Sequence, residues 1–143
     1  MKKIILAILL VAFALSTYKV VREATEIKLE NKNISFLVYK NSSYTSPVYN
    51  SASAQVHIIV EKVNIYGQHT IVWDKTYDAE YLSHYPSVEN AYKQTITVPN
   101  VNQKKEYLLV NYLLNYNSNG YQMQMHEATV VKDKSTAKVD ISI

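Results

Sequence analysis

The stretch "EYLLVNYLLNYNSNGYQMQMHEATVV", residues 106–131, contains two runs in which apolar and polar side chains alternate, joined by Asn119-Gly120. Alternation with a period of two is typical of a half-buried β-strand, and Asn-Gly between two such runs is a strong signal for a two-residue hairpin turn. The sequence therefore predicts an antiparallel hairpin in one fixed register. In that register Tyr116 lies opposite Met123.

The predicted hairpin has two unlike faces. One is mostly apolar and is expected to face a core; it contains Tyr112, Leu114, Tyr116, Met123 and Met125. The other is made of uncharged amides; it contains Asn111, Asn115, Asn117, Gln122 and Gln124. Between Tyr107 and Val131 the only formal charge is Glu127, although exposed sheet edges normally carry charges that prevent unwanted pairing. The amide face therefore either docks another molecule or lies under a neighbouring strand.

Further strand-like runs occupy residues 34–39, 54–63, 70–77, 93–101 and 137–143. Polar or irregular connectors separate them, and residues 78–92 have room only for a turn of helix and a loop. Seven or eight short alternating strands are typical of a two-sheet sandwich. The predicted fold is therefore all-β, an antiparallel sandwich over residues 34–143, and no fixed-period repeat suggests a solenoid or propeller.

The run "TITVPNVNQKKEYLLVNYLLNYNSNGY", residues 95–121, resembles immunoglobulin-like and fibronectin type III-like domains in its spacing. The resemblance covers residues 34–131 and implies a corner tyrosine at Tyr107, a core aromatic at Trp73 and a final hairpin turn at residues 117–120. The chain departs from antibody-type domains because it has no cysteine. The resemblance implies a scaffold used by adhesins, carbohydrate-binding modules, spacers and filament subunits, not an activity.

The N-terminus, "MKKIILAILLVAFALSTYK", has two lysines, an apolar run over residues 4–15 and a small-x-small site at residues 12–14. This order is typical of a bacterial secretory signal peptide. We expect residues 1–16 to be a signal peptide, or alternatively a retained hydrophobic helix, and residues 17–33 to be a polar linker or edge strand. The expected location is secreted: extracellular, cell-surface or periplasmic.

Composition narrows the function classes. Without Lys2 and Lys3, thirteen basic residues face twelve acidic ones, which leaves a net charge of +1. No stripe of lysine and arginine with interleaved aromatics follows the chain, so a nucleic-acid partner is not expected. The absence of cysteine excludes disulfides and thiolate chemistry.

No pattern of catalytic or metal-ligating residues is present. The four histidines are scattered, and the spacing of Asp74, Asp78 and Glu80 does not match a calcium loop. No nucleophile-elbow, paired-carboxylate or zinc-protease motif occurs. We expect no enzyme activity, no metal and no cofactor; a small periplasmic hydrolase is kept only as a residual alternative.

Tyrosines are abundant around the irregular segment 78–92, and an aromatic ring with a polar tip suits contact with sugars. Tyr81 and Tyr85 are the candidate contacts, whereas alternation with Ile71 assigns Trp73 to the core. The favoured function is a non-catalytic structural or adhesive subunit that acts through protein-protein assembly or self-association at the hairpin. Glycan binding by the tyrosine-bearing loop is the alternative.

Overall fold

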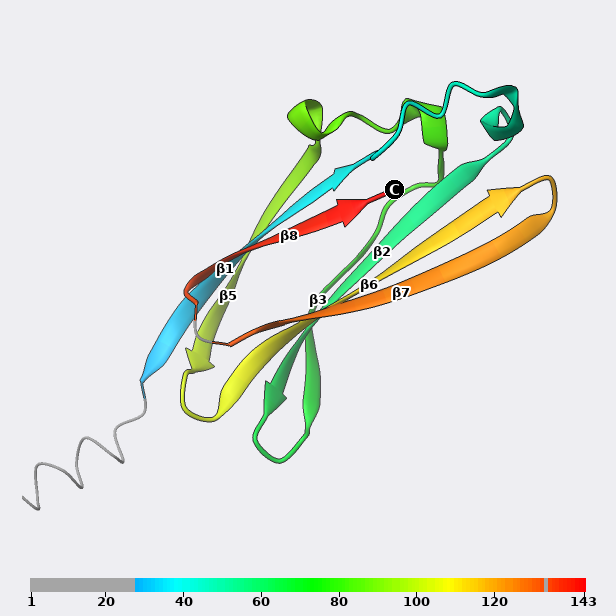
Figure 1. Ribbon diagram of the computed structural model, residues 1–143. Helices are drawn as coiled ribbons and strands as arrows, with labels where there is room; N and C mark the ends of the chain where they lie inside the picture. Colours follow the sequence, from blue (N-terminus) through cyan, green and yellow to red (C-terminus); the bar gives the residue numbers. More distant parts are fainter. Residues whose placement is uncertain (1–27, 133) are drawn as a thin grey trace, which may run out of the picture.

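The computed structural model describes residues 28–132 and 134–143, and most of these residues are in β-strands (Figure 1). The eight strands are β1 (Leu29–Tyr39), β2 (Ser53–Asn64), β3 (His69–Thr76), β4 (Glu80–Tyr81), β5 (Tyr92–Asn102), β6 (Glu106–Ser118), β7 (Tyr121–Val131) and β8 (Thr136–Ser142). Three single-turn 3-10 helices lie in the connectors: η1 (Pro47–Tyr49), η2 (Leu82–His84) and η3 (Val88–Asn90). The expected signal helix lies outside the described residues.

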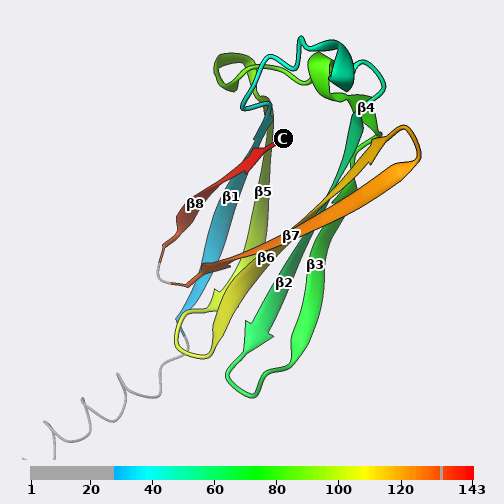
Figure 2. The ribbon, with the colours of Figure 1, turned by 45° about the vertical axis from the view of Figure 1, so that its right-hand side comes forward.

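The strands form two sheets that face each other (Figure 2). One is three-stranded, in the order β5-β1-β8, and the other is five-stranded, in the order β3-β2-β6-β7 with β4 paired to β2. The predicted all-β two-sheet sandwich is therefore confirmed. The prediction that all pairing is antiparallel is wrong for β8, which runs parallel to β1. The reason is that the chain crosses from one sheet to the other after β7 instead of turning back beside it.

The core lies between the sheets and follows the alternation of the sequence. Every second residue of β2 from Ala54 to Val60 is buried, as are the inward residues of β1. Phe36 of β1 stacks on Trp73 of β3, with ring centroids 5.2 Å apart and an interplanar angle of 8°. Trp73 is partly buried and packs against the core, on the side that alternation predicted.

Ile71 does not share the core environment of Trp73, because the β2–β3 register slips between Val60 and Glu61. Val60 pairs with Trp73, but Glu61 already pairs with Ile71, so Val72 is an extra residue on β3. Such a bulge interrupts alternation locally. Ile71 consequently remains 59% exposed.

Strand β1 starts at Leu29 and is the central strand of its sheet, so it includes the last part of the 17–33 segment. Within that part, Lys32 has a fully buried side chain. Its Nζ donates hydrogen bonds to the carbonyl oxygens of Lys132 (2.7 Å) and Lys134 (2.9 Å) and lies 3.7 Å from Glu30 Oε2. These contacts satisfy an ammonium group that would otherwise be costly to bury.

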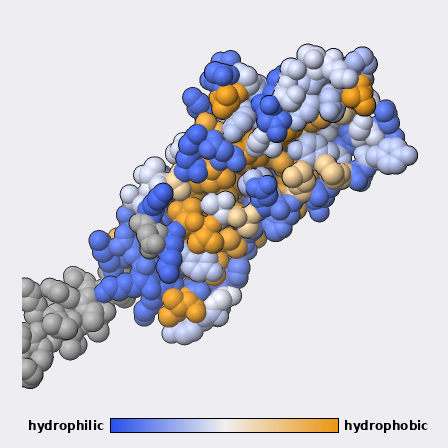
Figure 3. Space-filling model, viewed as in Figure 1, coloured by the Kyte–Doolittle hydropathy of each residue, from blue (hydrophilic) through white to orange (hydrophobic). Residues whose placement is uncertain are grey.

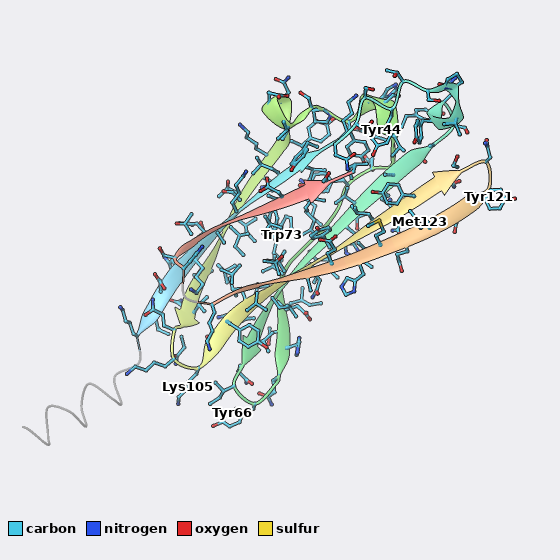
Figure 4. The ribbon with its side chains drawn as sticks, viewed as in Figure 1. Tyr44, Tyr66, Trp73, Lys105, Tyr121 and Met123 are labelled. Carbon is cyan, nitrogen blue, oxygen red and sulfur yellow. The ribbon has the colours of Figure 1, made fainter. Side chains whose placement is uncertain are left out.

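The connector between β1 and β2 closes one end of the sandwich. Tyr44 packs against the core, and its hydroxyl donates to the carbonyl oxygen of Ile143 over 2.7 Å (Figure 4). At the same end, Ser51 Oγ donates to Asn119 Oδ1 over 2.7 Å. The connector thereby forms hydrogen bonds both to Ile143 and to the tip of the β6–β7 hairpin.

Candidate interaction surface

The β6–β7 hairpin has the predicted register. Tyr116 pairs with Met123, Asn115 pairs with Gln124, and the turn residues are Asn119 and Gly120. Both turn residues have positive φ, 50° and 84° respectively. This is the left-handed conformation that a type I′ turn requires at both central positions, which is why Asn-Gly specifies the hairpin.

The apolar face of the hairpin is only half covered. Tyr112 and Leu114 of β6 are buried, but Met123 and Met125 of β7 are 57% and 42% exposed. The core assignment of these two methionines is therefore wrong. Alternation identified the correct side of the strand, but the three-stranded sheet ends at β8 and leaves this side of β7 open.

An apolar band is visible on the surface between β8 and the β6–β7 hairpin (Figure 3). Met123 lies on the hairpin beside this band, whereas Tyr121 projects from the turn end (Figure 4). Residues 121–130 are all exposed, and among the described strands β7 pairs with β6 alone. The local sequence pattern does not indicate this exposure. It follows from the pairing of β8 with β1 in the other sheet, which the sequence did not predict.

Only one charge lies on β7, and it is engaged. The hydroxyl of Tyr112 donates a hydrogen bond to Oε2 of Glu127, the residue directly opposite. Burial, followed by this bond and the nearby carboxylate, raises the pKa of Tyr112 above its usual value. The phenol therefore remains protonated and holds the carboxylate beside β6 at neutral pH.

The amide face is open to solvent. Asn117, Gln122 and Gln124 are exposed, and Gln124 Nε2 donates to Asn115 Oδ1 over 2.8 Å. These four amides line a shallow hollow of about 510 Å³. Its other lining residues include the neutral polar Ser53 and Gln55 of β2. Within the described part of the chain, no neighbouring strand covers this face.

Asn111, the fifth predicted amide, lies apart from the hollow. Its Nδ2 donates to Glu61 Oε2 over 2.9 Å, and its Oδ1 is 3.3 Å from His126 Nε2. Asn111 is thus committed to side chains of the neighbouring strands. The structure brings four of the five predicted amides together and separates the fifth.

The two candidate tyrosines of the irregular segment do not share an open surface. Tyr81 is 50% exposed, and its ring meets His84 edge-on at 5.5 Å. Tyr85 is buried, and its hydroxyl donates to the carbonyl oxygen of Ala54 over 2.9 Å. Its pKa is raised mainly by burial. Tyr85 is therefore part of the core, and only Tyr81 presents its ring to solvent.

A separate groove of about 400 Å³ lies beside the same segment. Tyr77, Tyr92 and Glu80 contribute to its lining. The Tyr92 hydroxyl donates to Glu80 Oε2 over 3.2 Å, and Lys75 Nζ lies 4.5 Å from the centre of the Tyr77 ring. Glycan binding in this region stays a prediction, with Tyr92 as a more accessible ring than Tyr85.

Two of the four histidines, His57 and His69, lie beside acidic residues. His57 Nε2 lies 2.8 Å from Asp74 Oδ1, and His69 Nδ1 lies 3.4 Å from Glu61 Oε2. Within residues 28–132 and 134–143, no group of three His, Cys, Asp or Glu side chains is placed to hold a metal ion.

In the same residues, no helix has the length and apolar character needed to cross a membrane. No protein-family model, curated protein or solved structure matches this chain.

Proposed function

We propose that this protein is a secreted, non-catalytic structural or adhesive subunit that assembles with further copies of itself through β7. The observation that carries the proposal is the exposure of residues 121–130 on a strand that pairs, among the described strands, on one side only. A free edge strand presents a row of backbone N–H and C=O groups that another strand can pair with.

The other edge strands carry features that discourage such pairing. Strand β5 contains Lys93 and Pro99, and β3 contains Lys75 and the extra residue Val72. Strand β8 is short and bears a charge in Lys138. Lysine, proline, bulges and short length are the usual protections of sheet edges.

Strand β7 lacks all of these protections. It is eleven residues long, contains no lysine, arginine or proline, and pairs with β6 without any register shift. Its single carboxylate, Glu127, is bound by Tyr112. The contrast among edges of one molecule supports pairing at β7 more strongly than the exposure of any single side chain would.

A second copy of β7 is a chemically suitable partner. If two β7 strands pair antiparallel about a twofold axis at His126, Met125 lies opposite Glu127 and Gln124 lies opposite Ala128. No two formal charges of the same sign face each other, and Met123 and Met125 gain neighbours on the core side of the joined sheet. The five-stranded sheets of two copies would then continue into one another.

We also infer an immunoglobulin-like arrangement. In that fold the B and E strands pair in one sheet, and the C, F and G strands lie side by side in the other. Here β1 pairs with β5, and β2, β6 and β7 are neighbours in that order. Strand β8 takes the position of an A strand beside β1 but runs parallel to it.

The assembly proposal is tested by the mass of the exported chain, measured by light scattering over a wide concentration range. We expect a dimer or larger species whose fraction grows with concentration. The paired substitution Asn115→Lys and Gln124→Glu should shift the protein toward monomer without lowering its unfolding midpoint. A monomer at every concentration would overturn the proposal.

A further inference from the structure

Four lysines from separate segments line one open hollow at the three-stranded sheet, with a volume of about 860 Å³. Lys93 comes from β5, Lys132 and Lys134 come from the connection between β7 and β8, and Lys138 comes from β8. No aspartate or glutamate is among the described residues that line the hollow. Lys132, Lys134 and Lys138 are close together in the sequence, whereas Lys93 comes from the distant strand β5, so the sequence alone does not show that the four line one hollow.

Hydroxyl groups lie between the lysines. Thr95 of β5 pairs with Ser35 of β1, which pairs in turn with Lys138 of β8. Ser35 Oγ and Thr95 Oγ1 are 3.0 Å apart, and both residues line the hollow. Since neighbouring strands are about 4.8 Å apart, β5 and β8 are separated by roughly 10 Å. A ligand that reaches lysines on both sides of this row must be extended.

Another lysine, Lys32, does not line the hollow but contacts the backbone of Lys132 and Lys134. Nζ of the buried Lys32 donates hydrogen bonds to the backbone carbonyl oxygens of Lys132 (2.7 Å) and Lys134 (2.9 Å). Hydrogen bonds from a charged donor are among the stronger ones in proteins. Lys32 holds the carbonyl groups of Lys132 and Lys134 beside the hollow, so a ligand does not have to position these two residues on binding.

Among the described residues, one of the four lysines of the hollow has a carboxylate partner. Lys138 Nζ lies 2.9 Å from Asp140 Oδ1. The side chains of Lys93, Lys132 and Lys134 form no ion pair with any residue that the structure describes. Within the described residues, three of the four ammonium groups therefore have no carboxylate partner.

We propose that this lysine-lined hollow binds an anionic polysaccharide, a sugar chain that carries carboxylate or sulfate groups. Lysines attract the anionic groups, and the intervening hydroxyls of Ser35 and Thr95 suit hydrogen bonding to sugar hydroxyls. No aromatic side chain is among the described residues that line the hollow, although proteins that bind single-stranded nucleic acids usually stack bases on aromatic rings. Thr129, Val130 and Val131 of β7 also line the hollow, so it adjoins the end of the proposed assembly strand, but none of its lysines belongs to that strand.

The test measures binding of the full exported chain to heparin and to polygalacturonate, with neutral dextran and duplex DNA as comparison probes. The variant combines Lys132→Gln and Lys134→Gln. The matched control combines Lys104→Gln and Lys105→Gln in the β5–β6 turn, where Lys105 is labelled in Figure 4; neither residue lines the hollow. Both variants lose two positive charges, so they differ only in where the charges are lost.

We expect the chain to bind both anionic polysaccharides but not dextran, with affinity falling as salt rises. The hollow variant should bind about tenfold more weakly and the control less than about twofold more weakly, since each exposed ion pair contributes modestly. Equal loss in both variants, no binding to either polysaccharide, or equally tight binding to DNA would overturn the proposal. Light scattering of the same samples reports assembly separately, so failure of one proposal is distinguishable from failure of the other.

Discussion

Strands β3 and β7 are the two edges of the same five-stranded sheet, yet they meet solvent in different ways. Strand β3 contains a bulge and Lys75, and its Trp73 stacks on Phe36 across the sandwich. Strand β7 has a continuous register, one carboxylate, and two methionines that no opposing strand of the described chain covers. The β3 edge is therefore stabilised by packing and protected from pairing, whereas the β7 edge is open to another strand.

The largest expected effect comes from placing a charge on the free edge. His126→Lys would put two ammonium groups next to each other across the proposed twofold axis. Facing like charges at an interface cost several kcal/mol, so self-association should weaken by roughly a hundredfold, or about 3 kcal/mol. Sedimentation velocity over a concentration series measures this change.

The matched control is His69→Lys, the same chemical change on β3. His69 is exposed and lies near Glu61, so a lysine there keeps a carboxylate partner. We expect self-association to be unchanged. Equal weakening by the two substitutions would mean that β7 is not distinguished from β3, which contradicts the proposed role of β7.

A second prediction compares two residues that face each other on one hairpin. Leu114 is buried and pairs with Met125, which is 42% exposed. Truncation of a buried leucine leaves a cavity, so Leu114→Ala should lower the free energy of unfolding by about 3 kcal/mol. Met125→Ala should lower that of the monomer by less than about 1 kcal/mol. Urea titration at low protein concentration checks both; similar losses would show that β7 is covered after all.

A third prediction concerns the turn that sets the β7 register. Gly120 has φ of 84°, and beyond its chain neighbours no described atom lies within 4 Å of the place that an alanine Cβ would take, so Gly120→Ala meets backbone strain but no clash. The substitution should lower the free energy of unfolding by about 1 kcal/mol. Gly67→Ala, with φ of 76° in the β2–β3 turn, is the comparison at the other edge. Thermal denaturation measures both; no loss for Gly120→Ala would argue against the type I′ turn.

The smallest effect is a pH dependence. Burial raises the pKa of Tyr85 and of Tyr112 above the usual value of 10.0. Each folded-state phenol therefore holds its proton to higher pH than the unfolded state, so stability is fully present below pH 10 and falls as the pH rises further. Tyr85→Phe should lower stability by about 1 kcal/mol near pH 8, because the bond to Ala54 is lost, but should reduce the alkaline decline. Urea midpoints near pH 8 and above pH 10 check this, with the exposed Tyr66→Phe as control.

The features that sequence predicted are local ones. Positive φ at Asn119 and Gly120 follows from the chemistry of those two residues, and strict alternation then determines every pair of the hairpin. The inward-facing position of Trp73 and the irregular nature of residues 78–92 follow in the same way. Such properties depend on neighbours along the chain, so a single sequence contains them.

The features that sequence did not predict depend on distant segments. Alternation places Met123 and Met125 on one side of β7, but whether that side is covered depends on where the other sheet ends. Lys32 lies in a polar run, and its burial depends on carbonyl groups about a hundred positions away. The lysine-lined hollow arises in the same manner, because β8 joins β1 in parallel.

The central claim is that the free edge of β7 pairs with another copy of the chain, and amide hydrogen exchange tests it most directly. Because Ser118 pairs with Tyr121 next to the two-residue turn, the alternation of an antiparallel ladder directs the N–H groups of residues 122, 124, 126, 128 and 130 to the free edge. Raising the protein concentration should slow exchange at these five amides and leave the exchange of β3 unchanged. Fast exchange at the five amides at every concentration would contradict the claim.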